Sequence, residues 1–274
     1  MKQFCIVIPI YKSSLDPIEE ISIKSLKNIV EDKNYDIYFI THMGINRENY
    51  IKYFPKAKFK YFKRSYFENT KTYSYLCLSY DFYNRFSAYE FMLIYQLDCY
   101  LFRDEISAWC NKNYDYIGAP IFSNNAGWSL EKIDQNGKVI LSPVVGNGGL
   151  SLRKIETFKN MFDPNGEFRQ EYELTDKIFK KVIYEDWYIC NVISRFYDIH
   201  IASWEDACKF SLDMNVEAFY DASDSNELPM GTHAWDKNIR FWKKVIPELK
   251  NNKTVSDFCE EKHKEFFKIY YSEK

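Results

Sequence analysis

The sequence has few glycines and none of the glycine-rich signatures that bind phosphate. It contains nine glycines in 274 residues, and neither Gly-x-Gly-x-x-Gly nor Gly-x-x-x-x-Gly-Lys-Ser/Thr follows its first strand-like stretch. Dinucleotide-binding folds and phosphate-loop enzymes use those patterns to bring bare backbone against a pyrophosphate. A nucleotide bound by this chain must therefore have its phosphates neutralised in another way.

Membrane-spanning runs, secretory signals and paired cysteines are missing as well. No apolar run approaches the roughly 18 residues of a membrane helix, and Met1–Gln3 leads into a strand-like stretch without a signal-peptide pattern. The seven cysteines form no Cys-x-x-Cys pair, which indicates free, buried thiols and neither a zinc site nor a disulfide framework. We expect a cytoplasmic protein. Its net charge of -2 gives no general attraction to nucleic acid.

Strand-like and helix-like stretches alternate along the chain. The hydrophobic share of 46% and the charged share of 28% are those of a globular protein. The patterns predict strands over residues 4–9, 35–40, 59–62, 91–98 and 114–117, and helices over residues 16–30, 72–86, 103–110 and 185–197. Strand, helix and strand in succession indicate an α/β fold with a parallel sheet, whose first third resembles a nucleotide-binding half. Residues 235–274 predict a pair of helices packed on the outside.

Asp98 ends the apolar strand that the rest of the chain is organised around. The run from Phe91 to Leu97 does not alternate with polar residues, which is typical of a strand buried on both faces. In open α/β sheets ligands bind at the carboxyl edge, where Pro9 and Tyr11 would also lie and could meet a nucleobase. A metal ion or a sugar hydroxyl would satisfy the Asp98 carboxylate. The alternative is that Asp98 caps the next helix.

Three of the nine glycines fall in Gly146-Asn147-Gly148-Gly149. Such a concentration indicates a backbone that needs positive φ or comes very close to another group. We interpret it as a turn with a ligand pressed against bare backbone, with a plain turn between strands as the alternative. Arg153, which follows, is a phosphate ligand or an exposed arginine at a helix start.

Two further groups complete the candidate site. Glu185 and Asp186 open a helical segment, where paired acids are common because they complement the helix dipole. The dipole would lower the pKa of Asp186 and keep it ionised. His233 lies on a loop between Gly231 and Trp235, and it becomes a metal-ligand candidate if it folds back onto Asp98.

These motifs occur in the order of a known family. The stretches are Tyr95–Asp104, Asp115–Pro120, Gly146–Arg153, Glu185–Trp187 and Gly231–His233. Over roughly residues 60–236 the chain resembles glycosyltransferase-like proteins of bacterial surface-polysaccharide loci, which are similar to GT-A glycosyltransferases. The resemblance implies a GT-A-like, mostly parallel sheet with helices on both faces. It also implies a catalytic domain over residues 1–245, with a nucleotide-binding half at 1–98 and an acceptor half at 99–245, and a helical tail at 246–274.

By this resemblance each candidate residue receives a role. Asp98 matches the first acid of the Asp-x-Asp motif, and His233 matches the late histidine that completes a Mn²⁺ or Mg²⁺ site. Gly148 and Gly149 would border the donor sugar together with Pro9 and Tyr11. Asp186 would be the catalytic base, with Glu185 and Trp187 at the acceptor. Tyr100 stands where the second acid of Asp-x-Asp would be, so metal binding is weaker, is assisted by Asp104, or is dispensable.

The resemblance implies transfer of a sugar from a nucleotide sugar, specifically a UDP-sugar, to a saccharide or glycolipid acceptor with inversion. It would serve polysaccharide biosynthesis in the cytoplasm or at the periphery of the inner membrane. Two alternatives remain open: a nucleotidyltransferase, and a catalytically idle module that binds a nucleotide or a sugar.

Overall fold

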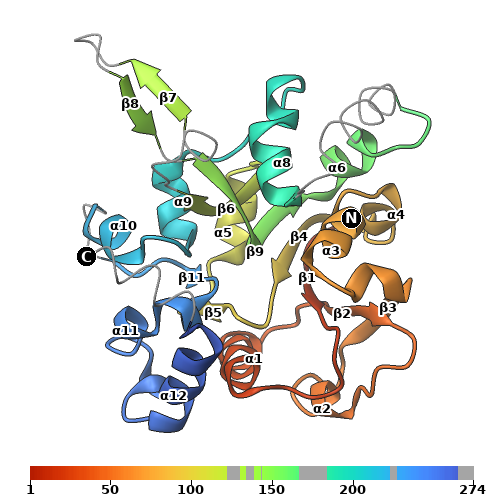
Figure 1. Ribbon diagram of the computed structural model, residues 1–274. Helices are drawn as coiled ribbons and strands as arrows, with labels where there is room; N and C mark the ends of the chain where they lie inside the picture. Colours follow the sequence, from red (N-terminus) through yellow and green to blue (C-terminus); the bar gives the residue numbers. More distant parts are fainter. Residues whose placement is uncertain (122–129, 134–138, 143, 167–183, 223–226, 265–274) are drawn as a thin grey trace.

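A computed structural model describes residues 1–121, 130–133, 139–142, 144–166, 184–222 and 227–264 of the chain. At its centre is a six-stranded sheet in the order β3-β2-β1-β4-β9-β6 (Figure 1). β1 is parallel to β2 and β4, β2 is parallel to β3, and β9 is antiparallel to both of its neighbours. The strands are β1 Lys2–Pro9, β2 Ile37–His42, β3 Lys58–Phe62, β4 Tyr89–Tyr95, β6 Tyr116–Ile121 and β9 Val144–Lys154. The mostly parallel α/β sheet is confirmed.

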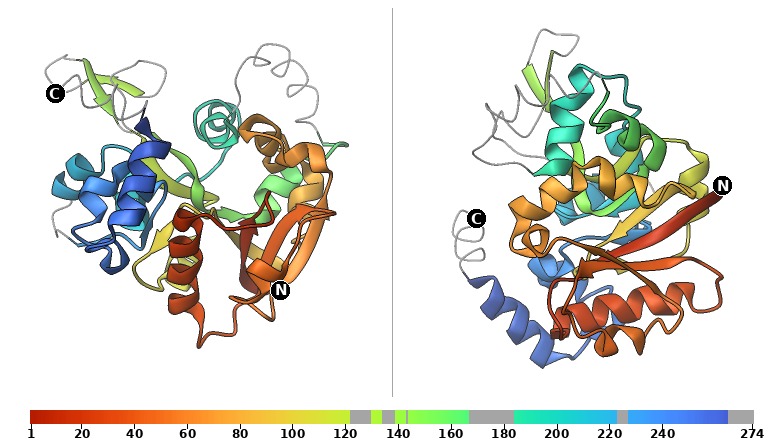
Figure 2. Two further views of the ribbon diagram at one scale, coloured as in Figure 1. Left: turned by 60° about the horizontal axis from the view of Figure 1, so that its bottom comes forward. Right: turned by 90° about the vertical axis from the view of Figure 1, so that its right-hand side faces the viewer.

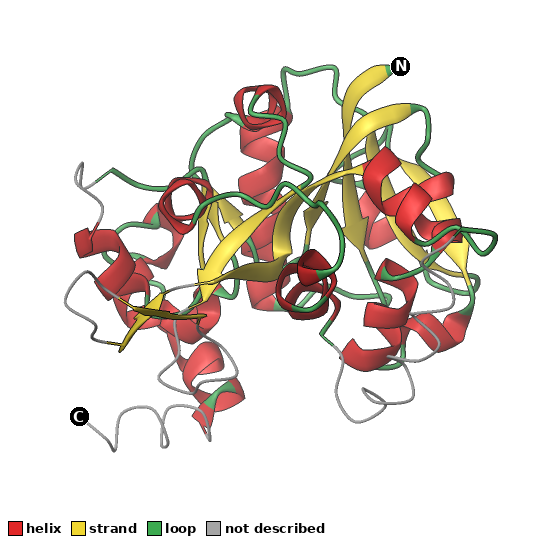
Figure 3. Cartoon of the chain, turned by 90° about the horizontal axis from the view of Figure 1, so that it is seen from above, coloured by secondary structure: helices red, strands yellow, loops and turns green. Residues whose placement is uncertain are grey.

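Helices cover both faces of this sheet, as the view from above shows (Figure 3). Strand β1 illustrates why: Cys5 and Val7 belong to one buried apolar cluster, whereas Ile6 and Ile8 belong to a second. Successive side chains of a strand point to opposite faces, so a strand that is apolar throughout requires cover on both. The first face carries α3 Thr70–Cys77, α4 Tyr80–Asn84, α6 Ile155–Met161 and α8 Glu185–Asn191, and the second carries α1 Pro17–Val30 and α5 Ile106–Asn111.

Helix α1 begins where the sequence predicts. Asp16 forms a capping box with Glu19, and Pro17 occupies the first helical position, where its missing N–H costs nothing. The buried residues Ile23, Leu26 and Val30 lie on the side that packs against the sheet. The strand-helix-strand prediction for residues 4–40 is therefore confirmed.

Three predicted elements differ from the structure. The helix expected over 72–86 is two helices, because Ser79 is extended and caps α4 through Phe82 N. The strand expected over 114–117 runs from Tyr116 to Ile121. The helix that begins at Glu185 ends at Asn191, and a 3-10 turn over Ile193–Arg195 follows it.

The last part of the chain forms a lobe beside α1. Its short sheet has the order β10-β11-β5, with strands Ser211–Leu212, Gly231–Thr232 and Tyr100–Leu101. The helices are α9 Trp204–Phe210, α10 Val216–Ala222, α11 Ile239–Trp242 and α12 Lys253–Lys262, with 3-10 turns over Trp235–Asn238 and Pro247–Leu249. A third apolar cluster joins this lobe to α1 through Ile18 and Ile21. Figure 2 shows the lobe, in blue, beside this helix, in red.

The remaining features are a hairpin, short helical segments and buried cysteines. The hairpin of β7 Leu130–Ile133 and β8 Val139–Ser142 projects from the body (Figure 1), and α2 Glu48–Ile51 and the 3-10 turn Arg64–Phe67 flank β3. All seven cysteines are buried free thiols, as expected. Among the described residues, no helix is both long enough and apolar enough to cross a membrane.

Candidate active site

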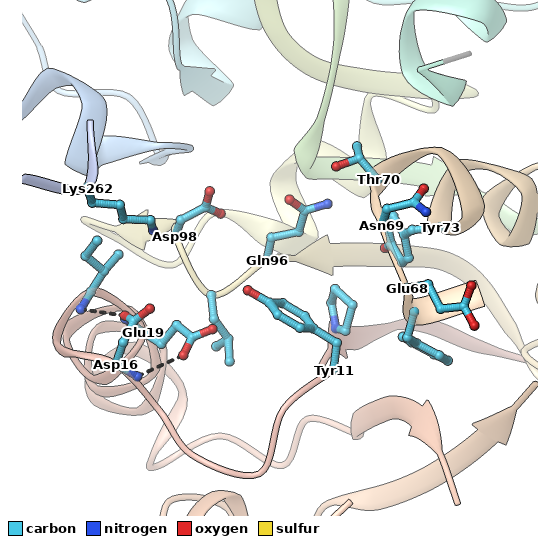
Figure 4. A pocket seen from close by; sticks show the side chains of 14 residues that line it. Tyr11, Asp16, Glu19, Glu68, Asn69, Thr70, Tyr73, Gln96, Asp98 and Lys262 are labelled. Carbon is cyan, nitrogen blue, oxygen red and sulfur yellow. Dashed lines mark hydrogen bonds between the residues drawn. The ribbon is translucent and has the colours of Figure 1, made fainter. Parts of the chain in front are cut away.

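A cavity lies where β1 and β4 end. Its volume is about 390 Å³, and Pro9, Tyr11, Gln96 and Asp98 line it. Figure 4 shows the side chains of Tyr11, Gln96 and Asp98 gathered around the same space. Tyr11 is 58% exposed, so its ring is accessible to a ligand. The carboxyl edge of a parallel sheet is the expected place for such a cavity.

Asp98 lies in the turn that follows β4, and not in the strand itself. Cys99 N donates to Gln96 O at 3.0 Å and closes the turn, and Gln96 N donates to Gly149 O at 2.9 Å on the neighbouring strand. Trp235 N donates to the carbonyl of Asp98 at 3.3 Å. These backbone bonds hold Asp98 at the rim, so the alternative in which it caps a helix is not what the structure has.

His233 folds back onto Asp98, which was the condition for a joint site. Its Nε2 lies 3.2 Å from Oδ1 of Asp98, and its Nδ1 lies 3.6 Å from Oδ2 of Asp213 on the other side of the ring. Burial would lower the pKa of His233, but the two carboxylates outweigh it and raise that pKa to about 10. Burial would likewise raise the pKa of Asp98, but His233 outweighs it and lowers that pKa to about 2.

Asp213 is a member of the site that the sequence analysis missed. It is buried, with 5% of its surface exposed, and its Oδ2 accepts a hydrogen bond from Asn147 Nδ2. It follows directly after the strand Ser211–Leu212, as Asp98 follows β4. Because that strand has only two residues, the sequence contains no pattern that could have identified Asp213.

The glycine segment is not a turn, which corrects the prediction. Residues 146–149 lie within β9, and none of these glycines has positive φ. The other expectation was that the backbone comes very close to another group, and Gly149 meets it. A Cβ placed at Gly149 would lie 2.0 Å from Nε2 of His233. At Gly148 a Cβ would lie 2.8 Å from Nη2 of Arg153 and 3.1 Å from Cβ of Asp186. The groups that lie against this backbone are thus side chains of the protein.

Asp186 is joined to the same strand. Its Oδ2 accepts a hydrogen bond from Gly148 N at 2.7 Å, and its Oδ1 accepts one from Trp187 N at 2.7 Å. Burial and then the neighbouring charge of Glu185 raise the pKa of Asp186 to about 7. The predicted lowering by the helix dipole is therefore wrong in direction, because burial and like charge dominate. Asp98, His233, the glycines and Asp186 form one contiguous group.

Glu185 and Arg153 lie beneath this group. Both are buried, and Arg153 Nη2 donates to Glu185 Oε1 at 2.8 Å. Ser74 Oγ donates to the other oxygen of Glu185 at 3.0 Å. Arg153 is neither an exposed residue nor a phosphate ligand here, because its guanidinium is fully buried against Tyr116 and Glu185. Both oxygens of Glu185 therefore have partners within the protein. Trp187 is half-buried and packs at the edge of the apolar cluster on the face of the sheet that α8 covers.

The structure excludes one of the three alternatives for the missing second acid, which is assistance by Asp104. Tyr100 is buried and donates its hydroxyl hydrogen bond to Glu248 Oε2 at 2.9 Å. Asp104 accepts a hydrogen bond from the Tyr35 hydroxyl at 2.8 Å. Tyr35 precedes β2, so Asp104 lies toward the opposite edge of the sheet from Asp98. Asp104 therefore does not assist a metal site at Asp98.

Asp98 and His233 fit a divalent ion as a pair. Oδ1 of Asp98 and both ring nitrogens of His233 are buried without a hydrogen bond, which is unusual for polar atoms. Adjacent ligands of an octahedral ion with bonds of about 2.1 Å lie about 3.0 Å apart, and these two atoms are separated by 3.2 Å. Within the described part of the chain no group of three or more His, Cys, Asp and Glu side chains could hold an ion. Further ligands would have to be phosphate oxygens or water.

The fold has relatives among solved glycosyltransferases. Mouse xyloside xylosyltransferase 1 has a TM-score of 0.54 over 84% of this chain and 97% of that chain, at 11% sequence identity. The galactosyltransferase LgtC, solved with donor and acceptor sugar analogues, has a TM-score of 0.52 over 83% of this chain and 86% of that chain, at 13% identity. These likenesses identify a GT-A-like glycosyltransferase fold.

The sequence also matches a known protein family. Residues 56–233 match the family described as "Protein of unknown function (DUF5672)", and the chain belongs to it. No curated protein sequence matches the chain. The matched segment includes Asp98, Asp186 and His233, whereas Pro9 and Tyr11 lie outside it.

Proposed function

We propose that this protein is a glycosyltransferase that moves a sugar from a nucleotide sugar to a saccharide acceptor. The observation that carries the proposal is the Asp98–His233 pair, whose facing atoms lack hydrogen bonds at the rim of a cavity on the carboxyl edge of the sheet. The GT-A-like fold supports it, since such sheets bind ligands at this edge.

In this proposal the donor occupies the cavity. Pro9 and Tyr11 contact the nucleobase side, and residues 1–98 form the nucleotide-binding half, while residues 99–245 form the acceptor half. Gly148 and Gly149 border the donor sugar through the side chains that lie against them, His233 and Asp186. Asp98 and His233 would hold Mn²⁺ or Mg²⁺, and such an ion neutralises charge that develops on a leaving nucleoside diphosphate. The donor is a UDP-sugar, and the acceptor is a saccharide or glycolipid of bacterial surface-polysaccharide biosynthesis.

Asp186 is the base in this proposal. An acceptor hydroxyl attacks the anomeric carbon, the bond from that carbon to the diphosphate oxygen breaks with inversion, and the hydroxyl proton passes to Asp186. A pKa raised to about 7 suits this step, because a base is most effective when its pKa lies near the working pH. Trp187 offers a ring to the acceptor sugar. Glu185 contributes from beneath, through Asp186, since its own oxygens are engaged.

The test is to incubate the protein with a panel of nucleotide sugars and Mn²⁺ or Mg²⁺ and to measure free nucleoside diphosphate. We expect release from one donor, its loss in Asp98→Asn, and no change in the surface control Asp81→Asn, whose side chain is 59% exposed on α4. NMR of the anomeric proton of the product then reports inversion or retention. Pyrophosphate released from a nucleoside triphosphate would favour a nucleotidyltransferase, and binding without turnover would favour an idle module.

A further inference from the structure

The C-terminal helix α12 is part of the cavity wall. Val255 and Cys259 of α12 pack in one apolar cluster with Ile18 and Ile21 of α1. Figures 1 and 2 show the two helices side by side. This helix lies beyond residue 233, where the family match ends.

Asp236 ties the end of α12 to the segment that carries His233. Asp236 is 1% exposed, and its Oδ2 accepts a hydrogen bond from Lys262 Nζ at 3.3 Å and lies 2.6 Å from His263 Nε2. Its neighbour Trp235 donates to the Asp98 carbonyl. The position of Lys262 is therefore coupled to the same turn that presents Asp98.

Lys262 is the one cationic side chain among the described residues that line the cavity. It extends from α12 towards Asp98 (Figure 4). The cavity also contains Asp16, Glu19 and Glu68. Lys12 lies 2.9 Å from Asp16 and 2.8 Å from Glu19, so the charges of these two acids are already paired. The side chain of Lys262 keeps 42% of its surface exposed, so its ammonium can reach a ligand while it stays beside Asp236.

We propose that Lys262 binds the diphosphate of the nucleotide ligand and that α12 is thereby a functional wall of the donor site. This inference rests on the proposed function, because it takes the ligand to be a nucleoside diphosphate derivative. The chain has no phosphate loop, and no group of three His, Cys, Asp or Glu side chains among its described residues could hold an ion. A lysine supplies positive charge to phosphate as a compact donor of three hydrogen bonds.

The experiment compares nucleotide and nucleoside binding by calorimetry. UDP, GDP, ADP and CDP are titrated with Mg²⁺ into the wild-type protein, and the nucleoside of the one that binds is titrated in parallel. Hydrogen bonds to charged groups are worth about 1.5–3 kcal/mol, so Lys262→Ala should lower the affinity for the diphosphate by about 10- to 100-fold. Binding of the nucleoside should not change. Lys262→Arg should retain most of the affinity, and Lys262→Gln preserves the stem if the alanine variant is unstable.

Lys264→Ala is the matched control, because it removes the same charge from a residue two positions further along, whose side chain is 60% exposed. If both lysine variants bind the diphosphate like the wild type, the inference is overturned while the proposed function stands. An equal loss of affinity for the nucleoside and for the diphosphate would also overturn the inference, because the substitution would then have disturbed the packing of the site. If the wild type binds no nucleotide or nucleotide sugar, the proposed function itself fails.

Discussion

A methyl group at Gly149 tests whether His233 must stay beside Asp98. A Cβ at this position would lie 2.0 Å from Nε2 and 2.1 Å from Cδ2 of His233, whereas ordinary contact begins at 3.4 Å. The ring would therefore have to retreat by at least about 1.4 Å, because a close-packed interior offers no spare room. Asp98, now 3.2 Å from Nε2, would lose its imidazole partner.

We expect Gly149→Ala to lower kcat/KM by about 100-fold, since misplacement by about 1 Å can cost that much. The free energy of unfolding should fall by about 1–3 kcal/mol, which is typical of overpacking. Gly146→Ala on the same strand is the matched control, because its Cβ would meet nothing closer than 3.5 Å. Nucleoside diphosphate release and urea unfolding provide the two measurements. Equal turnover in the two variants would refute the reasoning.

Three further predictions concern single side chains. The pKa of Asp186 is raised from 3.8 to about 7, so kcat/KM should increase with pH through about 7. Asp186→Asn should abolish transfer but keep nucleotide binding. A flat pH–rate profile of the wild type would contradict the role of Asp186 as a base. The pKa of His233 is raised from 6.5 to about 10, so the stability that its charge contributes is complete below pH 6.5 and is lost as the pH rises through 10. Urea unfolding of the metal-free protein should accordingly depend less on pH in this window in His233→Gln, and an identical dependence would count against the pairing. Asp213→Asn should weaken Mn²⁺ binding, measured by calorimetry with a nucleoside diphosphate present, by about 10- to 100-fold, whereas the surface control Asp81→Asn, whose side chain is 59% exposed, should not. Equal affinities of Asp213→Asn and the wild type would exclude a role for Asp213 in holding the ring.

The first half of the fold could be predicted because its signals are local. Strand β1 is a continuous apolar run, and α1 begins with a capping acid and a proline, so neither depends on distant contacts. Strand β9 could not be predicted in the same way. Its glycines suggest a turn, yet Gly148 and Gly149 are required because Arg153 of the same strand and Asp186 and His233 from other parts of the chain crowd that stretch of sheet.

The site shows the same division between local and distant information. Asp98 is recognisable as a carboxylate after a buried strand, and His233 is recognisable by its motif. Asp213 follows a strand of only two residues, which is too short to give a pattern. Lys262 reaches the cavity only because α12 packs on α1, and that packing depends on an apolar cluster assembled from several distant segments.

The adjacent acids Glu185 and Asp186 show how one local pattern divides into two roles. Glu185 turns inward to Arg153, and an ion pair buried in this way often adds nothing to stability compared with apolar residues. Its position gives a reason to keep it: the pair lies against Gly148, whose N–H holds Asp186. Burial raises the pKa of Asp186 most, the charge of Glu185 raises it further and that of Arg153 lowers it, so the buried pair adjusts the protonation of the residue proposed as base. A sequence pattern of two acids at a helix start contains no information about this division, because the partner that decides it lies on β9.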